Sequence, residues 1–487
     1  MRLLPVVALM LSACFNPVAE PCRSKLRCGL DGGEGGCSVG STRSCGSTLG
    51  ICKAGRQTCG TSGTWGRCIG GVVAGVEVCD GLDNNCDGVV DDGVMRACPL
   101  KKGVCAGAAS GCGDAGTCEA AYGAQYQAFE TKCDGLDNDC DGVVDRSAPV
   151  NVSRSPGVVS RRAAATAVPG SEAVLVLYEE GDKVAARVLK PDGTLTDAVP
   201  PSTTVDSATR ASLPALAASG ATLVGAWVEE TATEKRVMVA TLDPLTGRSN
   251  LSTGAALPAL NVTQPNDVAV ALDEAGQRLV VAVTDTNGLR IVAFSSAVPM
   301  GAPSVSVDPY DVQGRRVMVA PFGGSTFTFA HDRNDGLMRR AFIPSSGTAF
   351  PTEGSLSMGR DPALFGIDGG YVSVFLSGGA MARQVWRGSC VVTSGVACSD
   401  TMALTAAGDL DLLEVSAGQL AAWQAGVSSP RVQALWLGRP DAGAELSPGR
   451  RPVPVATAQR GWVVFDTESV SMTGVDSDEV YVMTTCR

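Results

Sequence analysis

The sequence predicts a mainly β protein in which a small disulfide-rich region precedes a much larger assembly of sheets. Cysteine usage is the first observation, because sixteen of the 19 cysteines lie before residue 141. Beyond about residue 160, short apolar runs alternate with turns rich in glycine, aspartate and proline, and no stretch keeps a helical period. The third observation is an acidic run of thirteen residues that occurs twice.

The first residues have the composition of an export signal. A short basic end, Met1-Arg2, precedes an apolar run over Leu3–Leu11, and Leu-Ser-Ala stands directly before Cys14. This order resembles a bacterial lipobox, which implies a signal peptide over residues 1–13 and a lipid on the Cys14 sulfur. Phe15 follows, which by analogy with enteric-bacterial sorting favours the outer membrane, with exposure to the periplasm or the cell surface. The alternative is a secreted protein cleaved elsewhere.

A cysteine-rich region follows the signal. Residues 14–36 form a tether rich in glycine and small polar residues, and residues 37–146 form two units, each ending in an acidic repeat at 77–92 or 131–146. In an exported protein these cysteines are expected in disulfides. Because the region has too few apolar residues to bury a core, the disulfides must substitute for one.

The two acidic runs, Cys79–Asp91 and Cys133–Asp145, are near-identical and lie 54 residues apart. In each run, side chains that carry oxygen alternate with other side chains, and glycine follows the third of them. This is the first half of a calcium loop, since the ion takes roughly six to eight oxygens and glycine permits a sharp turn. The expected ligands are Asp83, Asn85, Asp87, the Val89 carbonyl and Asp91 in the first loop, and Asp137, Asp139, Asp141, the Val143 carbonyl and Asp145 in the second.

We expect two structural Ca²⁺ ions of modest affinity. The twelfth loop position, a glutamate in EF-hands, is Val94 or Ala148 here, so the loops resemble those of thrombospondin type 3 and dockerin modules. Fewer ligands imply a dissociation constant of roughly 10⁻⁴ to 10⁻³ M. The second loop should bind more tightly, because Asp139 takes the place of Asn85. The alternative is a pair of solvated acidic turns held by disulfides.

The region also resembles a known family. The repeated Cys-Asp-Gly-Leu-Asp-Asn run, with Gly55-Arg-Gln-Thr-Cys59 and Gly63-Thr-Trp-Gly-Arg-Cys68 before it, is similar to the MopE-type metal-binding-motif repeats common in predicted lipoproteins of myxobacteria and their relatives. The resemblance covers residues 37–146 and implies a metal-binding module. The family label implies copper, so a copper-binding protein is an alternative function. The hard loop oxygens suit Ca²⁺ better, and His331 is the only histidine.

The cysteine count favours one long-range cross-link. With Cys14 lipidated, odd numbers of cysteines remain on both sides of residue 141. Cys390 and Cys398 are close enough in sequence to bridge a hairpin, which leaves Cys486 to pair with a cysteine of the N-terminal third. The alternative is a free thiol, and the connectivity cannot be read from the sequence.

Residues 160–487 divide into seven units of three or four short strands. Sheets this small cannot bury both faces alone, but they can when they pack radially around an axis. The prediction is a seven-bladed β-propeller, and the alternative is two β-sandwiches. An aromatic residue, expected to pack between blades, often ends the middle strand of a unit: Tyr178, Trp227, Phe375, Trp423 and Phe465.

The sheets show no pattern of a catalytic site. Their inner strands carry no convergent acids and no nucleophile–base pair, the sialidase-type turn S-x-D-x-G-x-x-W is absent, and His331 is expected in a surface turn. We therefore expect a protein that is not an enzyme. The alternative is a propeller enzyme that acts on an extracellular polymer.

Arginines stand just ahead of several inner strands. In a propeller, these positions approach one mouth of the central channel, where they could attract an anionic ligand. The alternative is a general preference, because arginine outnumbers lysine throughout the chain. The arginines of this predicted ring are Arg162, Arg210, Arg316, Arg360 and Arg451, and Arg161, Arg315 and Arg450 stand beside three of them.

The expected function is that of a surface-anchored lipoprotein that binds Ca²⁺ and presents a propeller for binding or scaffolding. Its partners would be the membrane, through the lipid, and a protein or glycan that the sequence does not identify. A formal net charge of −11 and the lack of a basic stretch argue against a nucleic-acid partner.

Overall fold

The computed structural model describes most of the chain from residue 36 onward. It leaves out 1–35, 113–116, 148, 154–157, 201–209, 250–254, 287, 295–303, 308–313, 323–325, 334, 344–354, 359, 368–369, 378–383, 393–395, 405–409, 416–419, 426–430, 437–443, 449, 458–459, 471–475 and 487. In some strands, mainly between residues 355 and 450, only the backbone of most residues is described. The predicted signal peptide and Cys14 lie outside the described residues. Among those residues, no helix has the length and apolar content that crossing a membrane requires.

The chain forms two compact units. The first contains residues up to 101 together with 106–124, and the second contains 102–105 and everything from 125 onward. The second acidic repeat therefore belongs to the same unit as the large sheets. The boundary runs through the cysteine-rich region, not after it.

The first unit has little regular structure. Strands β1 (Thr42–Cys45) and β2 (Gly55–Thr58) pair antiparallel, as do β3 (Met95–Ala97) and β4 (Ala109–Gly111), and α1 (Cys118–Ala121) is a single turn. Five disulfides between its described residues take the place of an apolar core, as predicted. They are Cys37–Cys59, Cys45–Cys68, Cys52–Cys86, Cys79–Cys112 and Cys98–Cys118.

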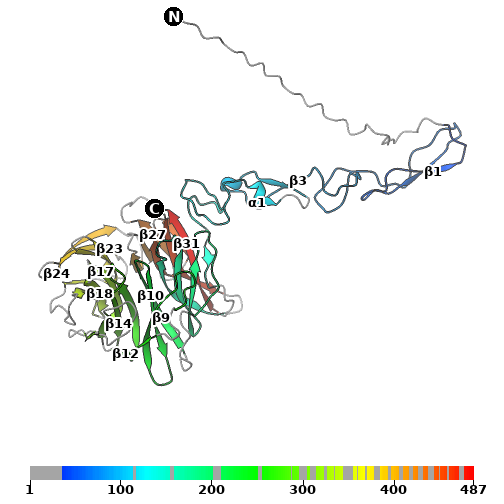
Figure 1. Ribbon diagram of the computed structural model, residues 1–487. Coiled ribbons are helices and arrows are strands. Elements are labelled where there is room, and N and C mark those ends of the chain that lie inside the picture. Colours follow the sequence, from blue (N-terminus) through cyan, green and yellow to red (C-terminus); the bar gives the residue numbers. More distant parts are fainter. Residues whose placement is uncertain are drawn as a thin grey trace, which may run out of the picture. The chain divides into compact units, whose positions relative to one another are not determined.

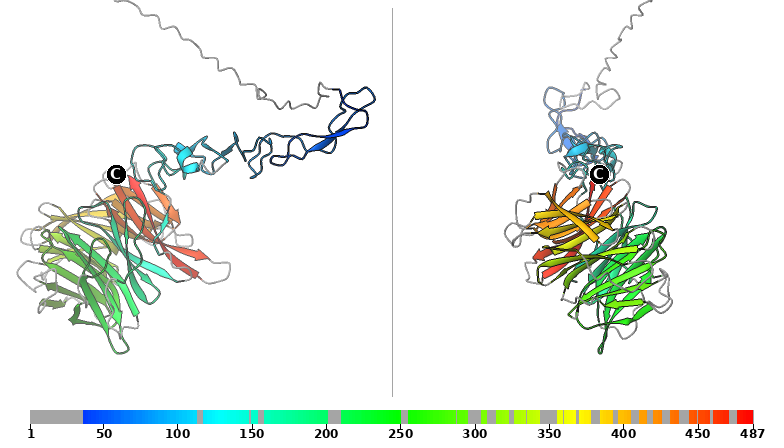
Figure 2. Two further views of the ribbon diagram at one scale, coloured as in Figure 1. Left: turned by 45° about the vertical axis from the view of Figure 1, so that its right-hand side comes forward. Right: turned by 90° about the vertical axis from the view of Figure 1, so that its left-hand side faces the viewer.

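The second unit begins with the short 3₁₀ helix η1 (Gly103–Cys105), which the disulfide Cys105–Cys140 ties to the second acidic run. Seven antiparallel sheets make up the rest (Figures 1 and 2). The first sheet has the order β6-β7-β8, with strands β6 (Ser160–Ala167), β7 (Val174–Glu180) and β8 (Lys183–Leu189).

Five four-stranded sheets follow, each built from consecutive strands. The second and third contain β9 (Arg210–Ser219), β10 (Thr222–Glu230), β11 (Lys235–Thr241), β12 (Ala255–Val262), and β13 (Pro265–Leu272), β14 (Leu279–Asp285), β15 (Gly288–Phe294), β16 (Ser304–Val307). The fourth and fifth contain β17 (Gly314–Phe322), β18 (Thr326–Arg333), β19 (Leu337–Ile343), β20 (Ser355–Met358), and β21 (Arg360–Ile367), β22 (Gly370–Ser377), β23 (Gln384–Val392), β24 (Val396–Leu404). The sixth contains β25 (Leu410–Val415), β26 (Leu420–Ala425), β27 (Arg431–Trp436) and β28 (Ala444–Pro448).

Both ends of the unit build the seventh sheet. Its strands β29 (Arg450–Ala456), β30 (Arg460–Val470) and β31 (Asp476–Cys486) come last in the chain, whereas β5 (Val150–Asn151) precedes the first sheet. The first strand of each sheet contacts that of the next, and β29 contacts β6 again. The sheets therefore form a closed ring, which confirms the seven-bladed β-propeller and not two sandwiches.

Packing between the blades uses the aromatic residues that the sequence indicated. Tyr178, Trp227, Phe375 and Phe465 are each at most 1% exposed. Each side chain buried in this way stabilises the fold by roughly 1.5–3 kcal/mol. The side chain of Trp423 lies outside the description, so its role stays a prediction.

One local expectation is wrong. His331, predicted in a surface turn, lies inside β18 and is 2% exposed, with its ring stacked on that of Phe329. The polar run Asp332-Arg333 after it misled the sequence interpretation, because that run continues the strand before the chain turns.

We predict that Cys133 pairs with Cys486. Cys133 is disulfide-bonded, and the other twelve cysteines from Cys37 to Cys140 form six disulfides with one another. The partner of Cys133 therefore lies elsewhere in the chain. The Arg460 side chain donates a hydrogen bond to the Thr131 carbonyl, and Arg460 stands opposite Cys486 in the β30–β31 register. Cys133, two residues after Thr131, is thereby brought to the end of the last strand.

Mass spectrometry of an unreduced tryptic digest checks this pairing. A peptide pair that links Cys133 to Cys486 is expected, together with one that links Cys390 to Cys398, which face each other between β23 and β24. Recovery of Cys486 as a free thiol in the intact protein would contradict the prediction.

Candidate metal centre and channel mouth

The two acidic runs fold alike. The backbone φ is 63° at both Cys86 and Cys140, and it is 101° at Gly88 and 98° at Gly142. The third such pair, Asp91 and Asp145, has φ values of 54° and 57°. Near-identical sequences therefore take one loop conformation in two different units of the molecule.

Backbone N–H groups hold the side chains of each loop. Gly88 N donates to Asp83 Oδ2 at 2.9 Å and Val89 N donates to Asp87 Oδ1 at 2.9 Å. The second loop repeats both bonds, from Gly142 to Asp137 at 2.9 Å and from Val143 to Asp141 at 2.7 Å. Asn85 and Asp139 each accept a bond from the N–H two residues on. These bonds fix the carboxylates in place before any ion binds.

The second loop gathers three carboxylates. Oxygen atoms of Glu130, Asp137 and Asp139 lie within 4.8 Å of one another. Glu130 and Asp137 are buried, and the atoms Glu130 Oε1 and Asp137 Oδ1 accept no hydrogen bond from the described residues. Burial raises the pKa of Glu130, and the charge of Asp139 raises it further. Like charges this close destabilise one another unless a cation is present, so the residues fit a divalent ion.

Glu130 is the ligand candidate that sequence reasoning missed. Its Oε2 accepts a bond from Asn138 N at 2.8 Å, and Glu77 accepts one from Asn85 N in the first loop. A signal was present, since a glutamate precedes each run. The spacing differs, however: Glu77 stands two residues before its cysteine, Glu130 three before Cys133, and neither belongs to the alternating pattern.

The residues predicted to close the loops make other bonds. Asp91 Oδ1 accepts from Asp80 N and Gly81 N, both at 3.1 Å, and Asp145 Oδ1 accepts from Gly135 N at 2.9 Å. These bonds join the end of each run to its beginning. Metal ligation by the two aspartates, and by the carbonyls of Val89 and Val143, stays a prediction.

A glycine turn supports each loop from outside the acidic run. Ile51 N and Val104 N donate to the carbonyls of Asp83 and Asp137, each at 3.0 Å. A Cβ on Gly103, the residue before Val104, would lie 2.2 Å from the Asp137 carbonyl oxygen. The sequence Gly-x-Cys is needed here because the backbones touch and the cysteine then binds the loop through a disulfide.

The second loop is attached to the seventh blade. The ring of Phe129 stacks on that of Trp462, with centroids 5.9 Å apart, and Arg460 donates to the Thr131 carbonyl. Burial lowers the pKa of Arg460, while the charges of Glu172 and Glu130 oppose that shift. Glu130 of the carboxylate cluster thus lies between two residues that contact the propeller.

A second candidate site lies where the first strands of the sheets meet. A cavity of about 400 Å³ is lined by residues of β6, β9, β13, β17 and β29, including Arg162, Arg316 and Arg451 of the predicted ring. Arg315, the residue before Arg316, also lines it. Arg210, at the start of β9, is not among the lining residues and stands opposite Glu230 in the β9–β10 register. The side chain of Arg360 lies outside the description.

An irregularity recurs in these first strands. The backbone φ is positive at Arg162 (50°), Leu213 (52°) and Arg451 (47°). A left-handed residue other than glycine costs about 1–2 kcal/mol, so the surroundings must hold it. The N–H groups donate to Asp466 Oδ2 at 3.1 Å, Glu179 Oε1 at 3.0 Å and Gln424 Oε1 at 3.3 Å, respectively.

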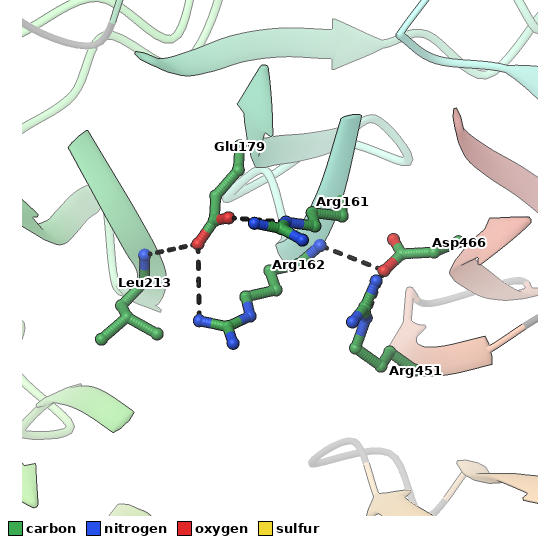
Figure 3. Close-up of polar contacts among 6 residues, drawn as sticks. All are labelled: Arg161, Arg162, Glu179, Leu213, Arg451 and Asp466. Carbon is green, nitrogen blue, oxygen red and sulfur yellow. Dashed lines mark hydrogen bonds and ion pairs between the residues drawn. The ribbon is translucent and has the colours of Figure 1, made fainter. Parts of the chain in front are cut away.

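The carboxylates that hold these backbones also pair with the arginines (Figure 3). Glu179 lies 3.8 Å from Arg162 Nη1 and 3.3 Å from Arg161 Nε, and Asp466 pairs with Arg451. The acid side chains are 1–2% exposed, whereas those of Arg162 and Arg451 are 47% and 35% exposed. Buried carboxylates therefore stand behind accessible guanidinium groups.

Sequence comparison identifies the metal loops. A family model described as "Putative metal-binding motif" (Cu-binding_MopE) matches residues 74–92 and 127–146. Both matches include the glutamate and the acidic run. The chain thus carries two copies of this metal-binding motif, beside a propeller. No curated protein sequence matches the chain.

Solved structures with a similar fold have little sequence in common with it. Hydrazine synthase of Kuenenia stuttgartiensis is 12% identical, with 64% of this chain and 93% of that chain covered and a TM-score of 0.42. The phage phi92 endosialidase is 9% identical, with 70% and 69% covered and a TM-score of 0.42. The Aleuria aurantia lectin is 10% identical, with 60% and 95% covered and a TM-score of 0.36.

The expectation that the chain is not an enzyme is corrected by these structures, most of which are enzymes. The expectation depended on finding no nucleophile–base pair along single strands. Blades bring together residues that are far apart in sequence, as Arg162 and Asp466 show, so a missing linear pattern does not exclude catalysis. At these identities the likeness concerns the fold alone.

Replacing Lys102 should strengthen ion binding by the second loop. Its Nζ donates to the Asp141 carbonyl at 2.7 Å, whereas the first loop has Leu49 at the equivalent position. Lys102→Leu removes a positive charge from the edge of the loop, and we expect about three- to tenfold tighter Ca²⁺ binding by calorimetry. Lys101→Leu, the same change one residue away, is the control, and equal affinities in the two variants would contradict the prediction.

Gly103→Ala should distort the second loop. Gly103 has a φ of +50°, which alanine adopts only with strain, and the new Cβ would lie 2.2 Å from the Asp137 carbonyl oxygen. We therefore expect a loss of at least about 2 kcal/mol in unfolding free energy. Gly107→Ala is the control, because Gly107 has a φ of +78° but nothing within 4 Å and should cost only about 1 kcal/mol. Urea unfolding measures both, and equal losses would show that the contact with Asp137 does not matter.

Proposed function

We propose that the chain is an exported, lipid-anchored protein that binds structural Ca²⁺ through its two acidic loops and uses its propeller to bind a ligand. The observation that carries the metal part is the cluster of Glu130, Asp137 and Asp139, in which the buried atoms Glu130 Oε1 and Asp137 Oδ1 accept no hydrogen bond from the described residues. A bound cation would supply the positive partner that these two oxygen atoms need.

The chemistry of the donors supports calcium over copper. The clustered atoms are carboxylate oxygens, which are hard ligands. Every cysteine from Cys37 to Cys140 is disulfide-bonded, so these residues offer no thiolate. The single histidine is buried in β18 and belongs to neither loop. Copper sites usually need such thiolate or imidazole ligands.

The place of the protein in the cell is proposed from the sequence. Residues 1–13 have the pattern of a signal peptide, and Cys14 follows a lipobox-like run. A single lipidated terminus anchors a protein without embedding its fold. The disulfides among the described residues agree with an oxidising compartment, such as the periplasm or the cell surface. The outer membrane is the proposed site of attachment.

Ca²⁺ should stabilise the second unit through Glu130 and Asp137. With the expected affinity, 10 mM Ca²⁺ adds about 1–3 kcal/mol to the unfolding free energy, seen as a rise in melting temperature. Glu130→Gln and Asp137→Asn should each remove most of that rise. Asp134→Asn is the matched control: it removes the same charge in the same run but keeps the oxygen that accepts the Leu136 N–H.

Two results would overturn this proposal. One is a melting temperature that does not respond to Ca²⁺ in the unchanged protein. The other is a response that Asp134→Asn reduces as much as Asp137→Asn does, since the effect would then be one of net charge. Cu²⁺ under the same conditions tests the copper alternative, which predicts the larger rise with that ion.

A further inference from the structure

The cavity where the first strands of the sheets meet, here called the channel mouth, has the features of a ligand site. Its volume of about 400 Å³ falls in the range of small-molecule pockets, and five of the seven first strands contribute to its lining. Arg162 and Arg451 come from neighbouring blades, the first and the seventh, while Arg315 and Arg316 come from the fourth. Four arginines from distant segments thus line one cavity.

The backbone geometry does not explain the arginines. Leu213 has a positive φ like those of Arg162 and Arg451, and a carboxylate accepts its N–H as one accepts that of Arg162. The strand irregularity is therefore compatible with an apolar side chain. Arginine at the two equivalent positions needs another reason, and a positively charged lining supplies one.

The arrangement of charges favours an anion. Glu179 and Asp466 are buried behind the strands, whereas Arg162 and Arg451 remain exposed by a third or more. Each guanidinium has five N–H donors, and the described pairing with an acid uses only part of them. Asp267 also lines the cavity, and its Oδ2 accepts a hydrogen bond from Val317 N at 3.0 Å.

We infer that the channel mouth binds a small organic anion whose carboxylate or phosphate group pairs with Arg162, Arg316 and Arg451. Guanidinium groups bind such oxyanions with two parallel hydrogen bonds, which makes arginine the suitable residue. Leu213 and Pro214 line the same cavity and offer apolar contact for the rest of the ligand. The inference names the ligand class of the proposed binding function and rests on it.

Three probes with one sugar body separate the possibilities: glucose 6-phosphate, glucuronate and glucose. Calorimetry on the full mature protein at low ionic strength should show binding of at least one of the two anions and at least tenfold weaker binding of neutral glucose. The anion that binds identifies phosphate or carboxylate as the preferred group. Affinity should fall when NaCl is added, since salt screens the attraction.

Arg162→Leu is the main variant, because Leu213 shows that the same backbone accepts leucine. It should weaken anion binding at least tenfold, as should Arg316→Gln. Arg161→Gln is the matched control, since Arg161 pairs with the same Glu179 but does not line the cavity. Its affinity should stay within about twofold of the unchanged protein.

The outcomes decide the inference independently of the metal loops. It is overturned if both anions bind no better than glucose. It is also overturned if Arg162→Leu and Arg316→Gln bind the anion as tightly as Arg161→Gln does, provided that their melting temperatures show them to be folded. Glu130→Gln should leave anion binding unchanged, so a failed calcium test and a failed anion test are separate results.

Discussion

Closure of the ring is the constraint on which the second unit depends. The ring is held shut because its last blade takes a strand from the other end of the chain, and β5 supplies that strand next to β31. Ser147 and Thr484 reinforce the closure, since each donates its N–H to the hydroxyl of the other, at 3.0 and 3.1 Å. The segment before β5 is consequently fixed to the seventh blade, and this segment carries the second metal loop.

Both candidate sites follow from carboxylates that the fold buries. At the channel mouth, Glu179 and Asp466 are compensated by arginines and by the N–H groups of strained residues. In the metal loop, Glu130 and Asp137 keep oxygen atoms without such donors among the described residues. Burying a carboxylate costs free energy at both sites. At the channel mouth, groups of the protein offset that cost, whereas in the metal loop a bound cation would offset it.

Local patterns predicted much of the molecule. Short apolar runs with glycine and aspartate turns were sufficient for a ring of seven sheets, because strand length and spacing are local properties. The aromatic residue at the end of a middle strand marked the interior, as Tyr178 and Trp227 confirm. His331 was misplaced because a strand that ends in Asp-Arg has the composition of a turn.

The sequence by itself determined the loops: alternating oxygen side chains before a glycine fix the local conformation, and two copies of the run take the same φ values. It also indicated the disulfide-knit region and the propeller. Only the tertiary structure decided which distant groups meet. Glu130, which stands outside the alternating run, folds back against Asp137 and Asp139. Arg162 shares a cavity with Arg451 because ring closure brings the two ends of the second unit together. No local pattern records that closure, since its contacts join residues more than 300 positions apart.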